Sequence, residues 1–487
     1  MASTNPVPSR EQRLGSCTAH GGSCAHLNGQ IKGKCLKKAS RSFTQATVCQ
    51  EWYSMFTLLT VQNTVSVVHA PVGCAASGAC MNIFNRCGQV VRGQARIQNA
   101  RWFATNLREP DIIHGGEAKL RETVKAADER HHPEAIFIFT SCASGIIGDP
   151  VANIVSELQN EVRARLVLSQ CEGFRSSVWA TGFDAAFHGI TEYLLEPRAE
   201  KEPDLVNIIS PLTVGRLDEV ELERLLGELG LRANFIPCYA TVAQLKRTVS
   251  AAATASTCLA YGDYFARVLT ERYGVPHTRE LMPVGLDGTD RWLLQLAALV
   301  GKEAEAQALI ERERRRIEPQ LAALRAQLEG KRVFVSAGQA RAMTFSLLGK
   351  ELGFELVGTT VYHYDDVIAE SINRLAAQSG AAQINVANIQ HFETANVLRR
   401  LNPDLYVADD MTTCWGAKQG FPTVPIYDYG MTYMGYNGLL AIGTRFANAL
   451  ANPSFAVKLA RHQRLPYQAS WYEQNPFKHI LSEGYTA

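Results

Sequence analysis

Short runs of apolar and β-branched residues recur along the chain, and each run is followed by a small-residue loop and then by a helical pattern. This alternation predicts parallel α/β units, because parallel strands are buried on both faces and need a crossover helix. Across 487 residues it indicates several sheets in series rather than one oversized core. The predicted strands cover residues 65–70, 135–140, 164–169, 206–210, 233–237, 332–337, 354–359, 405–408 and 424–427.

Two segments mark boundaries between the expected domains. Residues 196–204 are charged, contain two prolines and lack periodicity, whereas residues 301–330 predict a long polar helix that ends in glycine. Residues 1–40 show no apolar periodicity and predict an N-terminal extension. We therefore expect three Rossmann-like α/β domains over residues 41–200, 201–330 and 331–487, the last with a C-terminal tail.

Composition and missing motifs exclude several functions. The 49 basic and 47 acidic residues form no basic stripe, which argues against a nucleic-acid partner. No apolar run reaches the ~18 residues of a membrane span, and residues 1–16 lack the apolar core of a secretory signal, so we expect a cytoplasmic protein. A phosphate-binding Gly-x-x-x-x-Gly-Lys-[Ser/Thr] loop is absent, so the chain is not expected to bind ATP itself.

The twelve cysteines include several that stand singly at the ends of predicted strands. Cys74 follows the strand at 65–70 and Cys142 follows the strand at 135–140, which is where parallel α/β folds place functional groups. Cys258 directly precedes an amphipathic helix, whose dipole is expected to lower the pKa of the thiol and favour a metal-bound thiolate. Each cysteine taken alone also fits a small buried structural thiol.

A longer series of ordered motifs extends from about residue 45 to 450. It comprises Cys49, 71–74 (Pro-Val-Gly-Cys), 111–116 (Asp-Ile-Ile-His-Gly-Gly), Cys142 with 145–149, 171–175 (Cys-Glu-Gly-Phe-Arg), Cys258 with 271–276, 353–358, 363–366 (His-Tyr-Asp-Asp), 401–405 and 433–438. The series resembles the nitrogenase component 1 α-subunit superfamily.

This resemblance implies two metal clusters. Cys49, Cys74 and Cys142 would supply this subunit's share of a P-type [8Fe-7S] cluster at the interface with a homologous β-like (K-type) subunit, in an α2β2 heterotetramer. Cys258 would bind one end of a second [8Fe-9S-C]-type cluster between the domains, and Arg341 would face that cluster. Electrons would come from a transient partner, a homodimeric [4Fe-4S] iron protein that hydrolyses ATP.

Departures from the family pattern make the expected pocket more apolar. Met434 aligns with a histidine ligand of the molybdenum enzyme, and Met411 aligns with a lysine that anchors homocitrate. A thioether is a poor ligand for borderline metal ions, so we expect neither heterometal nor homocitrate. Trp179 and Phe183 replace a glutamine and a histidine, and His363 and His188 are candidates to face the pocket. The predicted pocket residues are Arg341, His363, Trp179 and Phe183.

Such a pocket is similar to that of the catalytic (D-type) subunit of methylthio-alkane reductases, which cleave C–S bonds of small volatile sulfides to methanethiol and a hydrocarbon. The alternative is a scaffold for assembling a nitrogenase-type iron–sulfur cofactor, and Met434 disfavours an iron or vanadium nitrogenase. The sequence leaves the substrate, the cluster composition and the second cluster ligand open. No ligand motif covers Cys17, Cys24 and Cys35, and buried thiols are expected at Cys80, Cys87, Cys171, Cys238 and Cys414.

Overall fold

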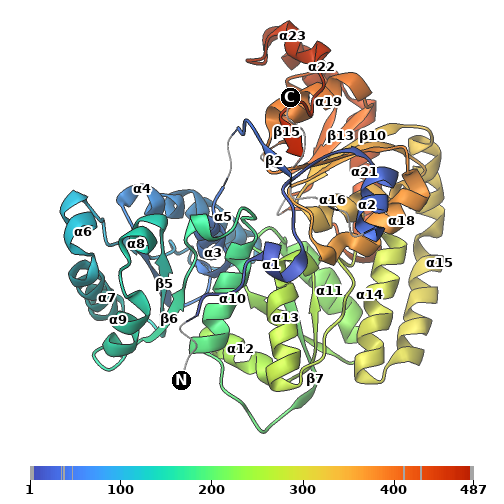
Figure 1. Cartoon of the computed structure of the whole chain (residues 1–487). Helices are drawn as coiled ribbons and strands as arrows, with labels where there is room; N and C mark the ends of the chain where they lie inside the picture. Colours follow the sequence, from blue (N-terminus) through green and yellow to red (C-terminus); the bar gives the residue numbers. More distant parts are fainter. Residues whose placement is uncertain are drawn as a thin grey trace.

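The computed structural model describes residues 5–33, 36, 39–45, 48–409, 412–427 and 430–482. Within these residues, three sheets built mainly of parallel strands follow one another along the chain, with helices packed around them (Figure 1). The expected α/β class with parallel sheets is confirmed. The central strands form because their residues are apolar throughout: every residue of β5 (Ala135–Thr140) is buried, as a strand covered on both faces requires.

The first domain holds the four-stranded parallel sheet β4-β3-β5-β6. It lies at the left of Figure 1. Its elements are α3 (Gln50–Leu58), β3 (Thr64–His69), α4 (Val72–Ala75), α5 (Ser77–Val91), β4 (Trp102–Ala104), α6 (Glu109–His114), α7 (Glu117–His131), β5, α8 (Cys142–Ile147), α9 (Val151–Leu158), β6 (Arg165–Ser169), η1 (Gly173–Arg175) and α10 (Thr181–Tyr193).

The second domain holds the three-stranded parallel sheet β8-β7-β9. Its elements are β7 (Glu202–Ser210), α11 (Arg216–Glu228), β8 (Arg232–Pro237), α12 (Val242–Arg247), η2 (Thr248–Ser250), β9 (Ala251–Ser256), α13 (Leu259–Tyr273), α14 (Gly285–Val300) and α15 (Glu303–Leu328). The predicted long helix is thus α15. Because β7 already begins at Glu202, the irregular linker is shorter than the 196–204 segment expected from the sequence.

The third domain holds the six-stranded sheet β1-β12-β11-β10-β13-β14, and a β15-β2 pair lies beside it. Its elements are β10 (Arg332–Ala337), α16 (Gln339–Leu347), α17 (Gly349–Leu352), β11 (Glu355–Val361), η3 (Asp366–Ile368), α18 (Ala369–Ser379), β12 (Gln383–Ala387), α19 (His391–Leu401), β13 (Leu405–Ala408), α20 (Thr413–Ala417), β14 (Thr423–Pro425), α21 (Gly435–Ala451), α22 (Ser454–His462), α23 (Ala469–Glu473) and β15 (Ile480–Ser482).

The N-terminal segment crosses the molecule rather than standing apart from it. It contains α1 (Arg10–Leu14), β1 (Ala19–Ser23), α2 (Cys24–Lys32) and β2 (Ala39–Arg41). Strand β1 pairs antiparallel with β12, so this segment forms one edge of the third sheet. Helix α1 lies near the centre of Figure 1, where the three domains meet.

All nine predicted strands are present, with boundaries that differ by a few residues. The sequence pattern missed β9, whose residues Ala-Ala-Ala-Thr-Ala-Ser lack large apolar side chains, although β9 pairs along β7 and is largely buried. It also missed the short strands β2, β4 and β15, and the edge-forming β1 with its partner β12. Among the described residues, no helix has both the length and the apolar content to cross a bilayer.

The topology brings the carboxyl ends of the strands toward the centre of the molecule. Cys258 follows β9, Arg341 follows β10 and His363 follows β11. Ligand sites in parallel sheets form at these ends, because the loops there leave a crevice. The fold therefore gathers residues from distant parts of the chain around one central cavity.

Candidate functional site

A cavity lies between the three domains, and the space inside it is about 110 Å³. All four predicted pocket residues and Cys258 line it. The full lining comprises Trp52, Tyr53, Phe56, Phe84, Trp179, Ala180, Phe183, Pro211, Thr213, Cys258, Ala260, Tyr261, Gly338, Gln339, Ala340, Arg341, Tyr362, His363, Asp409 and Tyr427. Each domain contributes one wall.

Cys258 stands at the N-cap of α13, as the sequence predicted. Its backbone N–H donates to Ser256 Oγ at 3.1 Å, and its thiol makes no capping hydrogen bond. Burial raises the pKa of the Cys258 thiol, although the positive charges of Arg341 and Arg10 act in the opposite direction. The expectation of a lowered pKa is therefore wrong for this chain by itself, because desolvation outweighs the nearby positive charges and the backbone hydrogen bond from Tyr261.

Arg341 lies in the first turn of α16 and supplies positive charge to the cavity wall. Its guanidinium stacks over the ring of Tyr427 at 4.0 Å from the ring centre, and Nη2 donates to the carbonyl of Thr213 at 3.4 Å. These contacts anchor the side chain between the second and third domains. A buried guanidinium of this kind offsets negative charge on a bound group.

The aromatic wall of the cavity is built on α3 and the start of α10. The rings of Trp179 and Tyr53 stack with their centres 3.8 Å apart, and Phe183 packs edge-on against Tyr53 at 4.9 Å. Tyr261 of α13 extends the cluster, with its ring centre 4.7 Å from that of Phe183. The wall is consequently apolar and held by mutual ring contacts.

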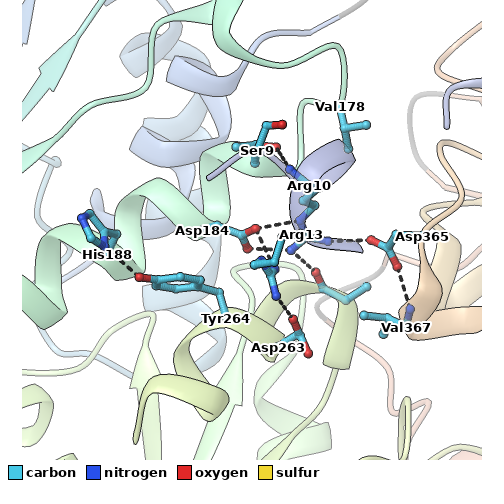
Figure 2. Close-up of polar contacts among 12 residues, drawn as sticks. Ser9, Arg10, Arg13, Val178, Asp184, His188, Asp263, Tyr264, Asp365 and Val367 are labelled. Atoms are coloured by element: carbon cyan, nitrogen blue, oxygen red, sulfur yellow. Dashed lines mark hydrogen bonds and ion pairs between the residues drawn. The ribbon is translucent and has the colours of Figure 1, made fainter. Parts of the chain in front are cut away.

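His363 enters the cavity wall from the loop after β11 and is 2% exposed. Its Nε2 lies 3.4 Å from Asp365 Oδ2, and its ring stands edge-on to Trp179 at 5.4 Å. His188, the other candidate, bonds Tyr264 at 2.7 Å and the Asn5 carbonyl at 3.0 Å, and it does not line the cavity (Figure 2). His188 therefore has a structural role rather than one in the cavity.

The structure describes Met434 but not Met411. Met434 is 1% exposed, caps α21 and packs in the core shared by the second and third domains, and it is not a lining residue of the cavity. Met411 lies outside the described residues.

A second candidate site is formed by Cys49, Cys74 and Cys142 on the surface of the first domain. Cys49 precedes α3, Cys74 lies in α4 and Cys142 begins α8. Desolvation raises the pKa of the Cys74 thiol, and negative charge on Glu51, Cys49 and Cys142 raises it further, so the three thiols are close enough to interact. We call Cys49, Cys74 and Cys142 the surface thiol triad.

Gly173 leaves space beside this triad. A Cβ atom at Gly173 would lie 3.1 Å from Cys142 Sγ and 3.4 Å from the Cβ of Cys49. Glu51 is buried next to the triad, and desolvation raises the pKa of its carboxyl to about 8. Its Oε1 has no hydrogen-bond partner. Large apolar side chains are exposed around the triad: Val72 of α4, Ile146 of α8 and Phe174 of η1 are 63%, 75% and 57% exposed.

The side chains at the triad and in the cavity are chemically suited to the iron–sulfur clusters that the sequence resemblance implies. Three thiols are the ligands that iron–sulfur clusters use, and among the described residues no three His, Cys, Asp or Glu side chains suit one single metal ion. Several polar atoms in the cavity wall are buried without hydrogen-bond partners, among them Trp179 Nε1, Tyr362 OH, Gln339 Oε1 and His363 Nδ1. Such orphaned atoms cost about 1 to 3 kcal/mol each unless a bound group pairs with them.

The remaining cysteines separate into buried and exposed thiols. Cys171 and Cys238 are buried as predicted, whereas Cys80, Cys87 and Cys414 are exposed, so the prediction is wrong for those three. Cys80 and Cys87 lie on α5, whose outer face is open to solvent on this chain. Cys17 and Cys24 are buried, and Cys35 lies outside the described residues.

Sequence reasoning missed several residues that shape the cavity. Tyr53 and Gln339 line it, and Asp365 and Arg10 stand directly behind its wall. Asp365 carried a signal, since it belongs to the 363–366 motif. No sequence signal pointed to Arg10, because a charged segment without apolar periodicity is typical of a solvent-exposed terminus.

Comparison with known proteins agrees with this geometry. The family model described as nitrogenase component 1 type oxidoreductase matches residues 49–451. The nitrogenase molybdenum-iron protein alpha chain of Methanosarcina barkeri is 24% identical over 452 residues, covering 81% of this chain and 84% of that protein. The nitrogenase iron-molybdenum cofactor biosynthesis protein NifE of Nostoc sp. is 24% identical over 438 residues, covering 88% of each.

The fold is also that of a solved nitrogenase. The structure titled "Nitrogenase Cp1 at pH 5" aligns with a TM-score of 0.69 at 20% identity, covering 88% of this chain and 92% of that chain. The family match spans the surface thiol triad, Cys258, Arg341 and His363 alike. The chain therefore belongs to the nitrogenase component 1 type oxidoreductase family.

Proposed function

We propose that this chain is the catalytic subunit of a nitrogenase-like reductase that cleaves the C–S bond of small methylthio-alkanes. The reaction R–S–CH3 + 2 e⁻ + 2 H⁺ → R–H + CH3SH breaks one C–S bond, and the electrons come from a separate iron protein that hydrolyses ATP. The observation that carries the proposal is the apolar wall of Trp179, Tyr53 and Phe183 in the cavity that Cys258 lines.

The surface thiol triad is proposed to hold this subunit's half of a P-type [8Fe-7S] cluster. Support comes from the interaction among the three thiols and from their exposure on this chain, where one half of the ligand sphere stays open. The exposed apolar side chains of Val72, Ile146 and Phe174 suit burial against a β-like (K-type) subunit of an α2β2 heterotetramer. We place this complex in the cytoplasm.

Cys258 is proposed to bind a second iron–sulfur cluster of the [8Fe-9S-C] type, without heterometal or homocitrate. When bound, this cluster supplies low-potential electrons to the substrate. Arg341 offsets its negative charge, and the buried position of Met434 in the core is consistent with the absence of a ligand from that position.

The residues of the cavity wall then act on the substrate. The Trp179, Tyr53 and Phe183 rings bind the apolar alkyl groups and exclude water. His363 Nδ1, which has no hydrogen-bond partner, is positioned to hold or deliver a proton at the cavity surface. Proton delivery at this one point suits a reaction that needs two protons per C–S bond.

Anaerobic co-expression with the β-like subunit and the iron protein tests the proposal. We expect ATP-dependent release of methanethiol from ethyl methyl sulfide, together with iron and acid-labile sulfide but less than about 0.1 molybdenum or vanadium per chain. A complex that carries its full iron content yet releases no methanethiol from any methyl sulfide would contradict the proposal.

A scaffold for cofactor assembly is the second candidate, and the similarity to NifE favours it as strongly as the similarity to the alpha chains favours the enzyme. A scaffold must release its cluster to an acceptor protein, whereas an enzyme retains its cluster through many turnovers. Incubation with an iron-free acceptor component 1 separates the two, because only a scaffold would lose its cavity iron and activate the acceptor.

A further inference from the structure

The N-terminal helix α1 joins the three domains through one fully buried arginine. Arg10 Nε and Nη2 donate to the two carboxylate oxygens of Asp184 at 3.0 and 2.8 Å, and Nη1 donates to Asp365 at 3.1 Å. Figure 2 shows Arg10 between these two carboxylates, which come from α10 and from the loop after β11. The side chains of all three residues are 0% exposed.

Helix α1 contacts the backbone next to two predicted site residues, Trp179 and Cys258. Glu11 accepts from the backbone N–H of Ser177 at 2.7 Å and of Val178 at 3.3 Å, immediately before Trp179. Arg10 Nη2 donates to the Ala260 carbonyl at 2.7 Å, two residues after Cys258. One short helix therefore fixes the starts of α10 and α13 behind the cavity wall.

Asp365 links Arg10 to two side chains that line the cavity. It accepts from Gln339 Nε2 at 2.7 Å, and His363 Nε2 lies 3.4 Å from the same carboxylate. Its other oxygen accepts from the backbone N–H of Val367 at 3.1 Å, so the carboxylate is held at both ends. Gln339 Oε1 and both ring nitrogens of His363 have no hydrogen-bond partner in the cavity wall, so the contact of His363 with Asp365 is one of position and charge rather than a hydrogen bond.

Arg13 provides an internal comparison on the same helix. It pairs with Asp184 at 2.9 Å and with Asp263, and it stacks 5.5 Å from the ring centre of Tyr264. Arg13 thus ties α1 to the first and second domains, as Arg10 does, but only Arg10 contacts Asp365 (Figure 2). A substitution of Arg13 weakens the attachment of α1 without touching the route to His363.

We infer that Arg10 is a positioning residue: through Asp365 it fixes the ring of His363 and the amide of Gln339 in the cavity wall. This inference rests on the proposed function only in taking the cavity as the site of reaction. Arg10 offsets the negative charge of Asp365 and holds in place the carboxylate oxygen that His363 Nε2 faces. Arg10 Nη1 and Gln339 Nε2 donate to the same oxygen of Asp365, Oδ2.

Histidine ring spectroscopy on the full, cluster-free chain tests the inference directly. The protein is labelled with ¹⁵N-histidine, and the His363 ring signals are identified by their loss in His363→Gln. We expect Arg10→Gln to shift or broaden these signals, Arg10→Lys to restore them in part and Arg13→Gln to leave them unchanged. Equal shifts in Arg10→Gln and Arg13→Gln would reduce Arg10 to a merely structural role and overturn the inference.

Arg10→Gln removes one of the two guanidinium partners of the buried Asp184, so it can fail to fold. In that case Asp365→Asn, which keeps the side-chain volume and leaves the Arg10–Asp184 pair in place, is the deciding variant. The same His363 shift is expected from Asp365→Asn, and a folded variant with unchanged His363 signals would overturn the inference.

The loaded complex gives a second readout. Arg10→Lys is expected to lower kcat for the sulfide about ten- to hundredfold with little change in KM, because the aromatic wall that binds the alkyl groups stays in place. The two hypotheses fail separately: if wild-type complex makes no methanethiol but the ring signals respond as stated, the reductase proposal fails and the positioning role of Arg10 stands.

Discussion

The surface thiol triad and the central cavity are both built on thiols at the ends of secondary structure, yet only one is complete within this chain. The triad is exposed, with apolar side chains around it, whereas the cavity is closed by walls from three domains. Under the proposed function, the triad needs a partner surface, whereas the cavity needs only correct packing within the chain. Variants that separate these two requirements test the comparison.

The largest expected effect is at Cys258. Among the described residues Cys258 is the only cysteine that lines the cavity, so in Cys258→Ala methanethiol formation should fall below detection while the triad keeps its iron. Cys258→Ser should retain a small fraction of the cavity iron. Activity assays and iron analysis check this, with Cys238→Ala, a buried cysteine outside the cavity lining, as the matched control. Wild-type turnover in Cys258→Ala would refute the assignment.

Loss of a triad thiol should instead act on assembly. Cys74→Ala is expected to bleach most of the visible absorbance of the triad cluster and to weaken binding of the β-like subunit, because half of the shared ligand sphere is incomplete. Absorbance and size-exclusion chromatography measure the two effects. Cys80→Ala removes another exposed thiol on the next helix and should leave both unchanged. Equal losses in the two variants would argue against a special role for the triad.

The aromatic wall should set substrate affinity rather than cluster content. Trp179→Ala removes the ring stacked on Tyr53, so KM for the sulfide should rise about tenfold and the free energy of unfolding should fall by roughly 3 kcal/mol. Trp179→Phe should recover most of both. Trp471→Ala, which removes a distant indole packed on Phe392, should change stability but not KM. A raised KM in Trp471→Ala would show that KM reports stability alone.

The last prediction concerns the pH dependence that Glu51, buried beside the triad, gives to stability. Burial raises the pKa of its carboxyl from about 4.5 to about 8, so the folded chain keeps a proton that the unfolded chain releases above pH 4.5. The contribution of Glu51 to stability therefore falls as pH rises from about 4.5 to 8, by at most about 5 kcal/mol. Denaturant unfolding of the isolated chain at several pH values should show a steeper fall for wild type than for Glu51→Gln. Parallel curves would show that Glu51 ionises freely.

Much of the candidate site could be predicted from local sequence, because its residues follow strand and helix ends that the sequence itself encodes. The apolar runs before Cys142 and Arg341 predicted β5 and β10 to the residue, and the helical pattern after Cys258 predicted α13. The motifs then indicated a family, and the family match over residues 49–451 confirmed that family.

Other features depended on contacts between distant residues. The exposure of Cys80 and Cys87 follows from which face of α5 the first domain covers, and the raised pKa of Cys258 follows from burial between domains. Neither quantity is encoded in the spacing of residues. Strand β9, made largely of alanine, becomes a strand because β7 offers it a ladder of hydrogen bonds.

The sequence by itself determined the α/β class, the nine strands with large apolar runs, the family and the thiols at the element ends, since local periodicity and short motifs carry that information. Only the tertiary structure decided that Arg10 lies buried between Asp184 and Asp365, 174 and 355 residues away along the chain. The physical reason is that a charged terminal segment has no apolar pattern of its own. Its place in the core is set by carboxylates that the folding of three domains brings together.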